Sequence, residues 1–234
     1  ASNGAEARIG SISSRWEHYK DWKRINSEGE QGRADIETAL LGTCEKSRLL
    51  DLIENFTTFS TEKGGNTKIV ARNHQFLGVN NALEAVGNRH QREGRLGVFW
   101  HTQGSGKSYS MVFLAQKVFR KLRGNWTFVI VTDRVELDTQ IYKTFAGCGA
   151  ITKSEEEVRA DDGEHLKRLL RDNDMRYIFT LIHKFHARDG SAYPVLSERD
   201  NIIVITDEAH RSQYGSLASN MRQALPNASF IAFT

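Results

Sequence analysis

The stretch GVFWHTQGSGKS, residues 97–108, is the feature around which the chain is organised. An apolar run leads into a glycine-rich turn, and Lys107 and Ser108 then open a helix. Such a turn points backbone N–H groups inward and the helix N-terminus adds partial positive charge, so the stretch predicts a phosphate-binding loop. Lys107 would reach the β- and γ-phosphates of a nucleotide, and the Ser108 hydroxyl would ligate Mg²⁺. The full pattern has glycine where this chain has His101, so only GSGKS matches and other segments must support the interpretation.

The composition is that of a soluble protein of one domain or slightly more. The chain has 234 residues, of which 39% are hydrophobic and 26% charged. Its apolar runs are too short to cross a bilayer, and it begins without a signal-peptide pattern. A net charge of +3 permits nucleic-acid binding without requiring it. Because the chain lacks a first Met and stops just after an apolar run, we expect a piece of a longer polypeptide.

From residue 68 onward, short apolar runs alternate with segments of helical periodicity. This order predicts right-handed βαβ crossovers and an α/β fold, with a doubly wound, mainly parallel sheet covered on both faces. Ligands of such sheets bind at the carboxyl ends of the strands, where the glycine-rich turn lies. The expected strands are 97–100, 126–132, 177–182, 201–206 and 229–233, and the expected helices are 73–86, 108–122, 134–145, 163–171 and 216–225.

The first part of the chain predicts a small helical segment. Residues 1–12 resemble a linker, and Ser14 with Glu17 fits a capping box. Aromatic residues then recur at helical spacing, and an apolar stripe predicts a later helix. These sets are Trp16, Tyr19 and Trp22, followed by Leu49, Leu52, Ile53 and Phe56 in the helix 47–56, with another helix expected at 35–41. The sequence TEKGGNT, residues 61–67, is the clearest break, so we predict a helical segment at 1–62 and a second domain at 63–234.

Two acids follow the apolar strand IIVIT, namely Asp207 and Glu208. Their carboxylates are expected at the edge of the sheet where the glycine-rich turn also opens. Asp207 would hold Mg²⁺, and Glu208 would orient or deprotonate the water that attacks the γ-phosphate. An acid pair alone is weak evidence, but together with GSGKS it predicts a site for hydrolysis of a nucleoside triphosphate.

A glutamine upstream of the turn, Gln75 in RNHQF, predicts an adenine contact. Its amide can donate to and accept from the N6/N7 edge of adenine together, which favours ATP over GTP. Phe56 or Phe59 can stack on the base, although core packing is the favoured role of both residues.

Polar residues that follow two further strands are candidates for contacts with a nucleic-acid backbone. Hydroxyl and basic groups at a strand end and helix start suit phosphates, but they also suit capping and turns, and the residues alone favour neither. The candidates are Thr132, Asp133, Arg134, Gln140 and Thr180.

Together these motifs resemble a superfamily 2 helicase or translocase motor. TQGSGKS is similar to motif I, VTDRVELDTQ to motif Ia, TLIHKF to motif Ib, ITDEAHRS to motif II, and FIAFT to the start of motif III. The strings WHTQGSGKS, ITDEAHRSQYG, RNHQF and RLLDLIENFTTF resemble HsdR, the restriction subunit of type I restriction–modification enzymes, over nearly the whole chain.

The resemblance implies the first RecA-like lobe of an ATP-driven motor that moves double-stranded DNA. It assigns ATP and Mg²⁺ to residues of the loop and acid pair, DNA contacts to the candidates above, and coupling between ATP and DNA to His210. The residues matching ATP-site positions are Gln75, Thr102, Gln103, Gly104, Ser105, Gly106, Lys107, Ser108, Asp207 and Glu208.

The same resemblance implies partners and a cellular location. The expected partners are methyltransferase and specificity subunits, in the cytoplasm of a bacterium or archaeon and away from membranes. The nuclease and the second lobe with its arginine finger are expected outside these residues, so this piece should bind Mg·ATP weakly and hydrolyse it poorly. Two alternatives are a lobe of a DEAH-box RNA helicase and a non-catalytic interaction fragment with a nucleotide-binding fold.

Overall fold

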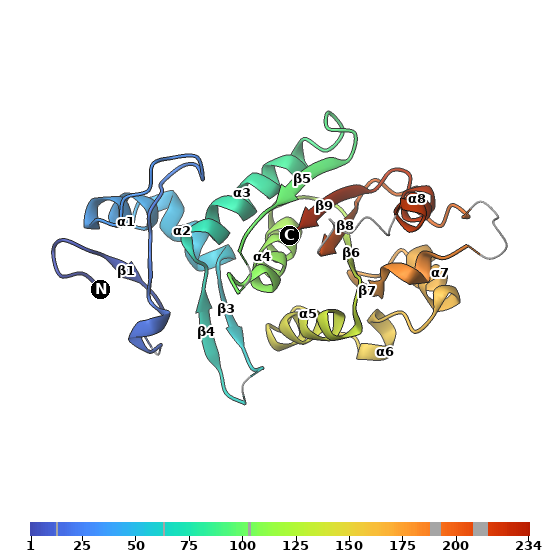
Figure 1. Ribbon diagram of the computed structural model, residues 1–234, viewed down its shortest axis with the longest axis horizontal. Coiled ribbons are helices and arrows are strands. Elements are labelled where there is room, and N and C mark those ends of the chain that lie inside the picture. The colour runs from blue at the N-terminus through green and yellow to red at the C-terminus, as the bar shows by residue number, and fades with distance from the viewer. Residues whose placement is uncertain (13, 63, 103, 188–192, 208–214) are drawn as a thin grey trace.

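The computed structural model describes residues 1–234 except 13, 63, 103, 188–192 and 208–214 (Figure 1). Its centre is a parallel sheet with strand order β5-β9-β8-β6-β7. All carboxyl ends of these strands therefore meet at one edge, which confirms the predicted RecA-like α/β fold class. The strands are β5 (Arg95–Phe99), β6 (Thr127–Thr132), β7 (Tyr177–Leu181), β8 (Ile202–Asp207) and β9 (Ser229–Phe233).

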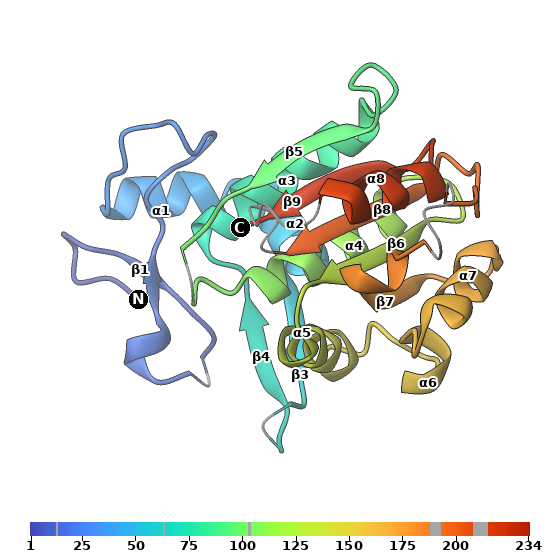
Figure 2. The ribbon, with the colours of Figure 1, turned by 45° about the vertical axis from the view of Figure 1, so that its right-hand side comes forward.

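The sheet lies in the core because its strands β6, β7 and β8 are apolar on both faces. Every residue of β6, TFVIVT, and of β7, YIFTL, is buried. Such runs of β-branched and aromatic residues are typical of parallel strands covered on both sides. Figure 2 shows α8 in front of the sheet and α3 and α4 behind it. The helices of this part are α3 (Asn73–Gly87), α4 (Lys107–Lys121), α5 (Val135–Gly147), α6 (Glu155–Val158), α7 (Gly163–Arg171), η2 (Ile182–Phe185) and α8 (Gly215–Ala224).

The N-terminal segment, residues 1–70, packs against α3. Its indole anchor, Trp22, is buried and lies 5.4 Å from the ring of Phe76. Gly42 makes room for this indole, because a Cβ at that position would overlap it. The elements of this segment are β1 (Arg8–Ile9), η1 (Trp16–His18), β2 (Lys20–Asp21), α1 (Ile36–Thr43), α2 (Lys46–Asn55), β3 (Thr57–Ser60) and β4 (Thr67–Val70).

The helix predicted after Ser14 is wrong. Only a single 3₁₀ turn forms, with Arg15 before it making no side-chain cap hydrogen bond, and the chain then enters β2. Pairing of β2 with β1 competes with the helix, and the ring of Trp16 stacks on Tyr19 at 5.3 Å while Trp22 turns into the core. Tertiary contacts therefore override the helical spacing of the aromatic residues. Residues 1–12, expected to be a linker, contain β1.

The expected apolar stripe on α2 is only partly buried. Leu52 and Phe56 lie in the core, whereas Leu49 and Ile53 are exposed. The expected break at residues 61–67 connects β3 and β4, which form an antiparallel hairpin that the sequence did not predict. These strands are short and partly exposed, so their sequences TTFS and TKIV lack a strong apolar signal. The division at residue 62 stays a prediction.

A buried lysine joins three helices beneath the sheet. The Lys117 ammonium on α4 donates to both carboxylate oxygens of Asp51 on α2, at 2.6 Å each, and to Asn80 Oδ1 on α3 at 2.5 Å. It also lies 4.6 Å from the ring centre of Phe56. The Lys117 side chain is 5% exposed and that of Asp51 is 22% exposed, so burial lowers the pKa of Lys117.

Among the described residues, no helix is both long and apolar enough to cross a membrane.

The exposure difference within this pair predicts unequal effects of removing each partner. Asp51→Ala leaves a buried ammonium without its counter-charge and should lower the free energy of unfolding by about 3–5 kcal/mol. Lys117→Met should cost less, because water can reach the remaining carboxylate. Urea unfolding of the two variants measures the difference, and a larger loss in Lys117→Met would contradict this account.

Candidate nucleotide site

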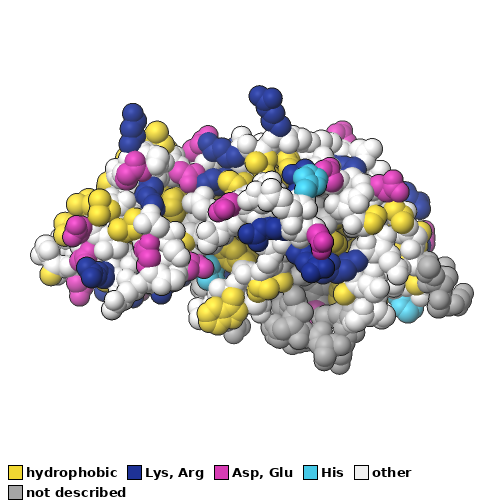
Figure 3. Space-filling model, turned by 90° about the horizontal axis from the view of Figure 1, so that it is seen from above, with side chains coloured by type: hydrophobic (Ala, Val, Ile, Leu, Met, Phe, Trp, Pro, Cys, Tyr) yellow, Lys and Arg dark blue, Asp and Glu magenta, His cyan; other side chains and the backbone are white. Residues whose placement is uncertain are grey.

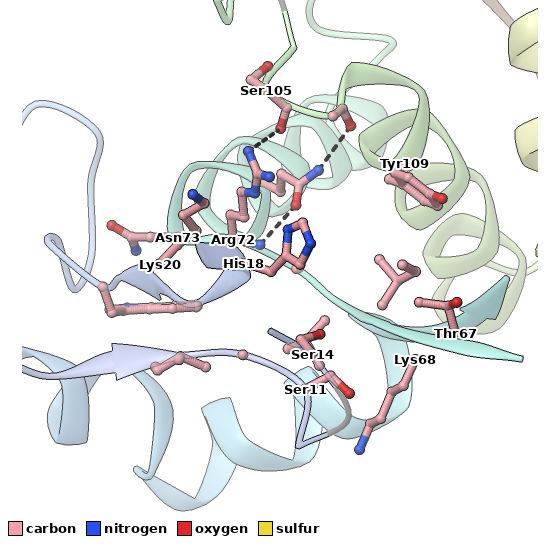
Figure 4. Close-up of a pocket in the computed structure, with 18 of the residues that line it drawn as sticks. Ser11, Ser14, His18, Lys20, Thr67, Lys68, Arg72, Asn73, Ser105 and Tyr109 are labelled. Atoms are coloured by element: carbon pink, nitrogen blue, oxygen red, sulfur yellow. Dashed lines mark hydrogen bonds between the residues drawn. The ribbon is translucent and has the colours of Figure 1, made fainter. Parts of the chain in front are cut away.

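A cavity of about 330 Å³ lies between the N-terminal segment and the loop before α4 (Figure 4). In Figure 4, Ser105 lies at one end of the cavity, Tyr109 at one side, and Ser11 and Ser14 at the opposite end. The volume lies within the range of pockets that hold small molecules. Its walls include Gly10, Ser11, Ser14, His18, Lys20, Thr67, Lys68, Ile69, Arg72, Asn73, Gln75, Gly104, Ser105, Gly106 and Tyr109.

The described part of the loop between β5 and α4 contains two glycines whose conformation suits a candidate phosphate loop. Gly104 and Gly106 adopt φ angles of +76° and +93°, in the left-handed region that favours glycine. At Gly106 a side chain is also excluded by space, because a Cβ would lie 2.9 Å from Gln75 Nε2. Helix α4 begins at Lys107, and its N-cap, Gly106, supplies no side-chain acceptor. The first N–H groups of the helix are therefore available to an anion.

Gln75 fixes the orientation of one peptide group in this loop. Its Oε1 accepts from the Arg72 backbone N–H at 2.8 Å, and its Nε2 donates to the Gly106 carbonyl at 2.9 Å. A trans peptide is planar, so a carbonyl held on one side sends the next N–H to the other. Gln75 thus aims the Lys107 N–H away from α3. The adenine contact predicted for Gln75 stays a prediction, because both ends of its amide bind protein groups here.

Ser105 is held in the same way by two side chains of the residues around the start of α3. Its carbonyl accepts from Arg72 Nη1 at 3.4 Å and lies 3.2 Å from His74 Nε2. These contacts aim the following N–H, that of Gly106, in the opposite direction. The Ser105 hydroxyl is buried and, in the part of the chain that the structure describes, has no hydrogen-bond partner. A buried hydroxyl left unpaired at a cavity wall suits a ligand that supplies the partner.

The acidic part of the predicted site is described at one position. Asp207 ends β8, where its backbone pairs with Phe233 of β9, and it is 9% exposed. It lines a second cavity of about 390 Å³ together with Thr132 and Asp133, whereas the first cavity meets the phosphate loop. Ser108, in the first turn of α4, is half-buried. The predicted roles of Gln103, Glu208 and His210 lie outside the described residues.

The structure separates the candidates for nucleic-acid contacts. Thr132 and Thr180 lie on adjacent strands, and each is 1% exposed. The Arg134 side chain is exposed and lies 3.5 Å from the carboxylate of Asp133. Gln140 is exposed farther along α5, beside a hollow that also includes Thr61 and Glu62. Figure 3 shows basic and acidic side chains interspersed on the described part of one face. The DNA contacts of all five residues stay predictions.

Sequence reasoning missed Arg72, His74 and the N-terminal wall of the cavity. Arg72 and His74 flank Asn73 in the motif RNHQF, so proximity to Gln75 was the available signal. The N-terminal wall, which includes Ser11, His18 and Lys20, left no signal because only the fold brings it to the loop.

Comparison with known proteins agrees with this geometry. Residues 74–234 match the family model of the SWI2/SNF2 ATPase. Over its whole length the chain is 40% identical to the type I restriction enzyme HindI endonuclease subunit of Haemophilus influenzae and 33% identical to the putative type I restriction enzyme MjaIXP endonuclease subunit of Methanocaldococcus jannaschii. It spans 24% of the length of each.

Among solved structures, a DEAD box protein from the hyperthermophile Methanococcus jannaschii aligns with 76% of this chain and 50% of its own, at 12% identity and a TM-score of 0.42. That likeness is too low to support a functional conclusion. The family match and the full-length similarity confirm the resemblance found in the motifs. The chain belongs to the SWI2/SNF2 ATPase family and is similar throughout to a segment of type I restriction endonuclease subunits.

Proposed function

We propose that the chain is the ATP-binding motor lobe of a type I restriction enzyme subunit. In that subunit, ATP hydrolysis would move double-stranded DNA, and a nuclease encoded elsewhere in the same polypeptide would cleave it. The observation that carries the proposal is the cavity whose wall includes the phosphate loop, with the Ser105 and Gly106 carbonyls bound by Arg72 and Gln75. Methyltransferase and specificity subunits are the proposed partners, by analogy with the type I enzymes whose subunits the chain resembles.

In this proposal, adenosine occupies the cavity next to Gln75. An amide group has two donor hydrogens and two acceptor lone pairs, and Gln75 uses one of each within the protein. One donor and one acceptor remain, which is the pair that the N6/N7 edge of adenine requires. Phe56 does not stack on the base, because it is fully buried and packs against Phe76 at 4.7 Å.

The triphosphate would extend from the cavity along the loop to the start of α4. The Gly106 and Lys107 N–H groups would donate to it, and the Lys107 ammonium would neutralise the β- and γ-phosphates. Ser108 and Asp207 offer oxygen ligands, which suit Mg²⁺, and the metal would neutralise charge on the phosphates. Glu208 would orient the attacking water, and His210 would transmit the state of the ATP site to the DNA side.

Double-stranded DNA is the proposed track of the motor. Arg134 is the exposed cation among the candidates and suits a backbone phosphate directly. Asp133, Gln140 and the two buried threonines would contribute if this surface rearranges when DNA binds. Phosphate contacts of this kind carry no sequence information, which fits a translocating motor whose recognition site is read elsewhere.

Lys107→Ala should weaken Mg·ATP binding by the 234-residue chain about 10–100-fold, because a charge-assisted contact to the phosphates is lost. Isothermal titration calorimetry measures the change. Lys121→Ala is the matched control: this lysine ends the same helix and pairs with Glu54 at 2.6 Å, away from the loop. Equal affinities in Lys107→Ala and the unchanged chain would refute the assignment of the loop.

Gln75→Ala should lower the affinity for ATP more than that for GTP, by a factor of about 3–10, because only adenine uses the proposed amide pair. Loosening of the Gly106 carbonyl affects both nucleotides, so the ratio of the two dissociation constants isolates the base contact. Gln223→Ala, at an exposed position of α8, serves as the control. An unchanged ratio would show that Gln75 only positions the loop.

In the full-length subunit, duplex DNA should stimulate ATP hydrolysis, and RNA should not. A coupled phosphate-release assay with equal nucleotide concentrations of each polymer makes the comparison. Arg134→Ala should reduce the stimulation by DNA while leaving the basal rate unchanged. Stimulation by RNA alone would favour a DEAH-box RNA helicase instead.

A further inference from the structure

His101 replaces the first glycine of the usual phosphate-loop pattern, and its ring is the centre of a cluster. The His101 side chain is 11% exposed, and its Nε2 lies 3.1 Å from the Glu28 carboxylate. Since a carboxylate only accepts, Nε2 carries the proton in this contact. The ring meets His74 edge-on, with centres 4.4 Å apart, and Phe99 at 4.6 Å. One residue therefore contacts the N-terminal segment, α3 and β5 together.

His74, which contacts His101, also contacts the phosphate loop. Its Nε2 lies 3.2 Å from the Ser105 carbonyl, which orients the Gly106 N–H as described above. Burial, followed by the charges of His101 and Arg72, lowers the pKa of His74 from its usual 6.5 to about 4. The ring is therefore neutral at pH 7, and the contact with Ser105 places its one proton on Nε2.

Helix α3 packs closely against the rings of Phe99 and His101. Gly78 of α3 faces them, and a Cβ there would lie 2.7 Å from the Phe99 ring and 3.6 Å from His101 Cε1. A side chain at Gly78 would push Phe99 away from α3, whereas its Cβ would be in ordinary contact with His101. The absence of a Cβ thus lets the rings of β5 and the loop lie directly on the helix that carries His74.

Glu28 belongs to a loop that is itself anchored. Asn73 Oδ1, at the start of α3, accepts from the Lys23 and Arg24 backbone N–H groups at 3.1 and 3.0 Å. Glu30 accepts from the Ile25 backbone N–H at 2.8 Å and closes the turn. Glu28 is therefore presented to His101 from a fixed backbone. Its side chain is 40% exposed, so it can be replaced without opening the core.

We propose that Glu28, His101 and His74 form a positioning link through which the N-terminal segment sets the phosphate loop for binding the triphosphate. The proposal rests on the function proposed above and names a specific use of the N-terminal segment in it. None of the three residues touches the nucleotide in this account. They act through the Ser105 carbonyl, and their removal changes how well the loop N–H groups are aimed.

Glu28→Ala tests the link. It should raise the dissociation constant of ATP about 3–10-fold, which corresponds to losing the net free energy of one hydrogen bond in the binding of ATP. The dissociation constant of adenosine, which does not use the loop, should change by less than about twofold. The melting temperature should be unchanged within experimental error. Glu28→Gln keeps an acceptor oxygen and should restore most of the ATP affinity. A calorimetric titration of the 234-residue chain with ATP and with adenosine provides these values.

A double-mutant cycle tests whether Glu28 and His101 act in series. Once His101→Ala has broken the link, adding Glu28→Ala should cause no further loss of ATP affinity. The matched control is His90→Ala, which removes an exposed histidine 3.4 Å from the carboxylate of Asp200; His90 precedes the start of β5, whereas the loop follows its end. It should leave both ligands unaffected.

The possible failures are distinguishable. If the unchanged chain is folded and does not bind ATP, the proposed function fails and this inference with it. If the chain binds ATP and Glu28→Ala binds it equally well, the link alone is refuted. Equal losses for ATP and adenosine, or a loss of the same size in His90→Ala, would also overturn it, because the effect would then not pass through the phosphate loop.

Discussion

Hydrogen bonds from the start of α3 to the Ser105 and Gly106 carbonyls decide which way the phosphate loop faces. The loop contains two glycines with positive φ, and glycine has no strong intrinsic preference for a single backbone conformation. Left alone, its peptide groups could rotate and present carbonyl oxygens to the phosphates. Gln75, His74 and Arg72 remove that freedom by binding the two carbonyls. The loop is thereby organised before any nucleotide arrives, which lowers the ordering cost of binding.

The first turn of α3 also binds the N-terminal segment, so that segment and the part of the chain that forms the sheet are held together at this turn. Asn73 binds the backbone of residues 23 and 24, while its neighbours hold the phosphate loop. The buried aromatic residues Trp22 and Phe56 pack against Phe76. The predicted division at residue 62 describes a change in sequence texture, but these contacts join the two sides through one core. Any movement of the N-terminal segment would therefore shift the groups that hold the proposed phosphate loop.

Residues with strong periodic signals were predictable, and those that depend on tertiary contacts were not. The helix Gly163–Arg171 and the strand Ser229–Phe233 occur where the sequence predicts them, because the first has apolar residues at helical spacing and the second is a short continuous apolar run. Trp16 and Tyr19 also recur at helical spacing, yet strand pairing by β2 wins. In the site, the glycine loop and Gln75 were found from sequence. The bond between Gln75 and Gly106 was not, because it joins positions 31 residues apart whose distance only the fold determines.

The departure from the phosphate-loop pattern at His101 has a physical explanation in these contacts. Glycine is favoured where φ is positive or where a Cβ would collide, and both conditions hold at Gly106 but neither does at residue 101. Position 101 can therefore accept a side chain without strain. A histidine there gains an acceptor in Glu28 and ring contacts with His74 and Phe99, which a glycine could not provide. The substitution thus exchanges an unneeded conformational freedom for a connection between the loop and the N-terminal segment.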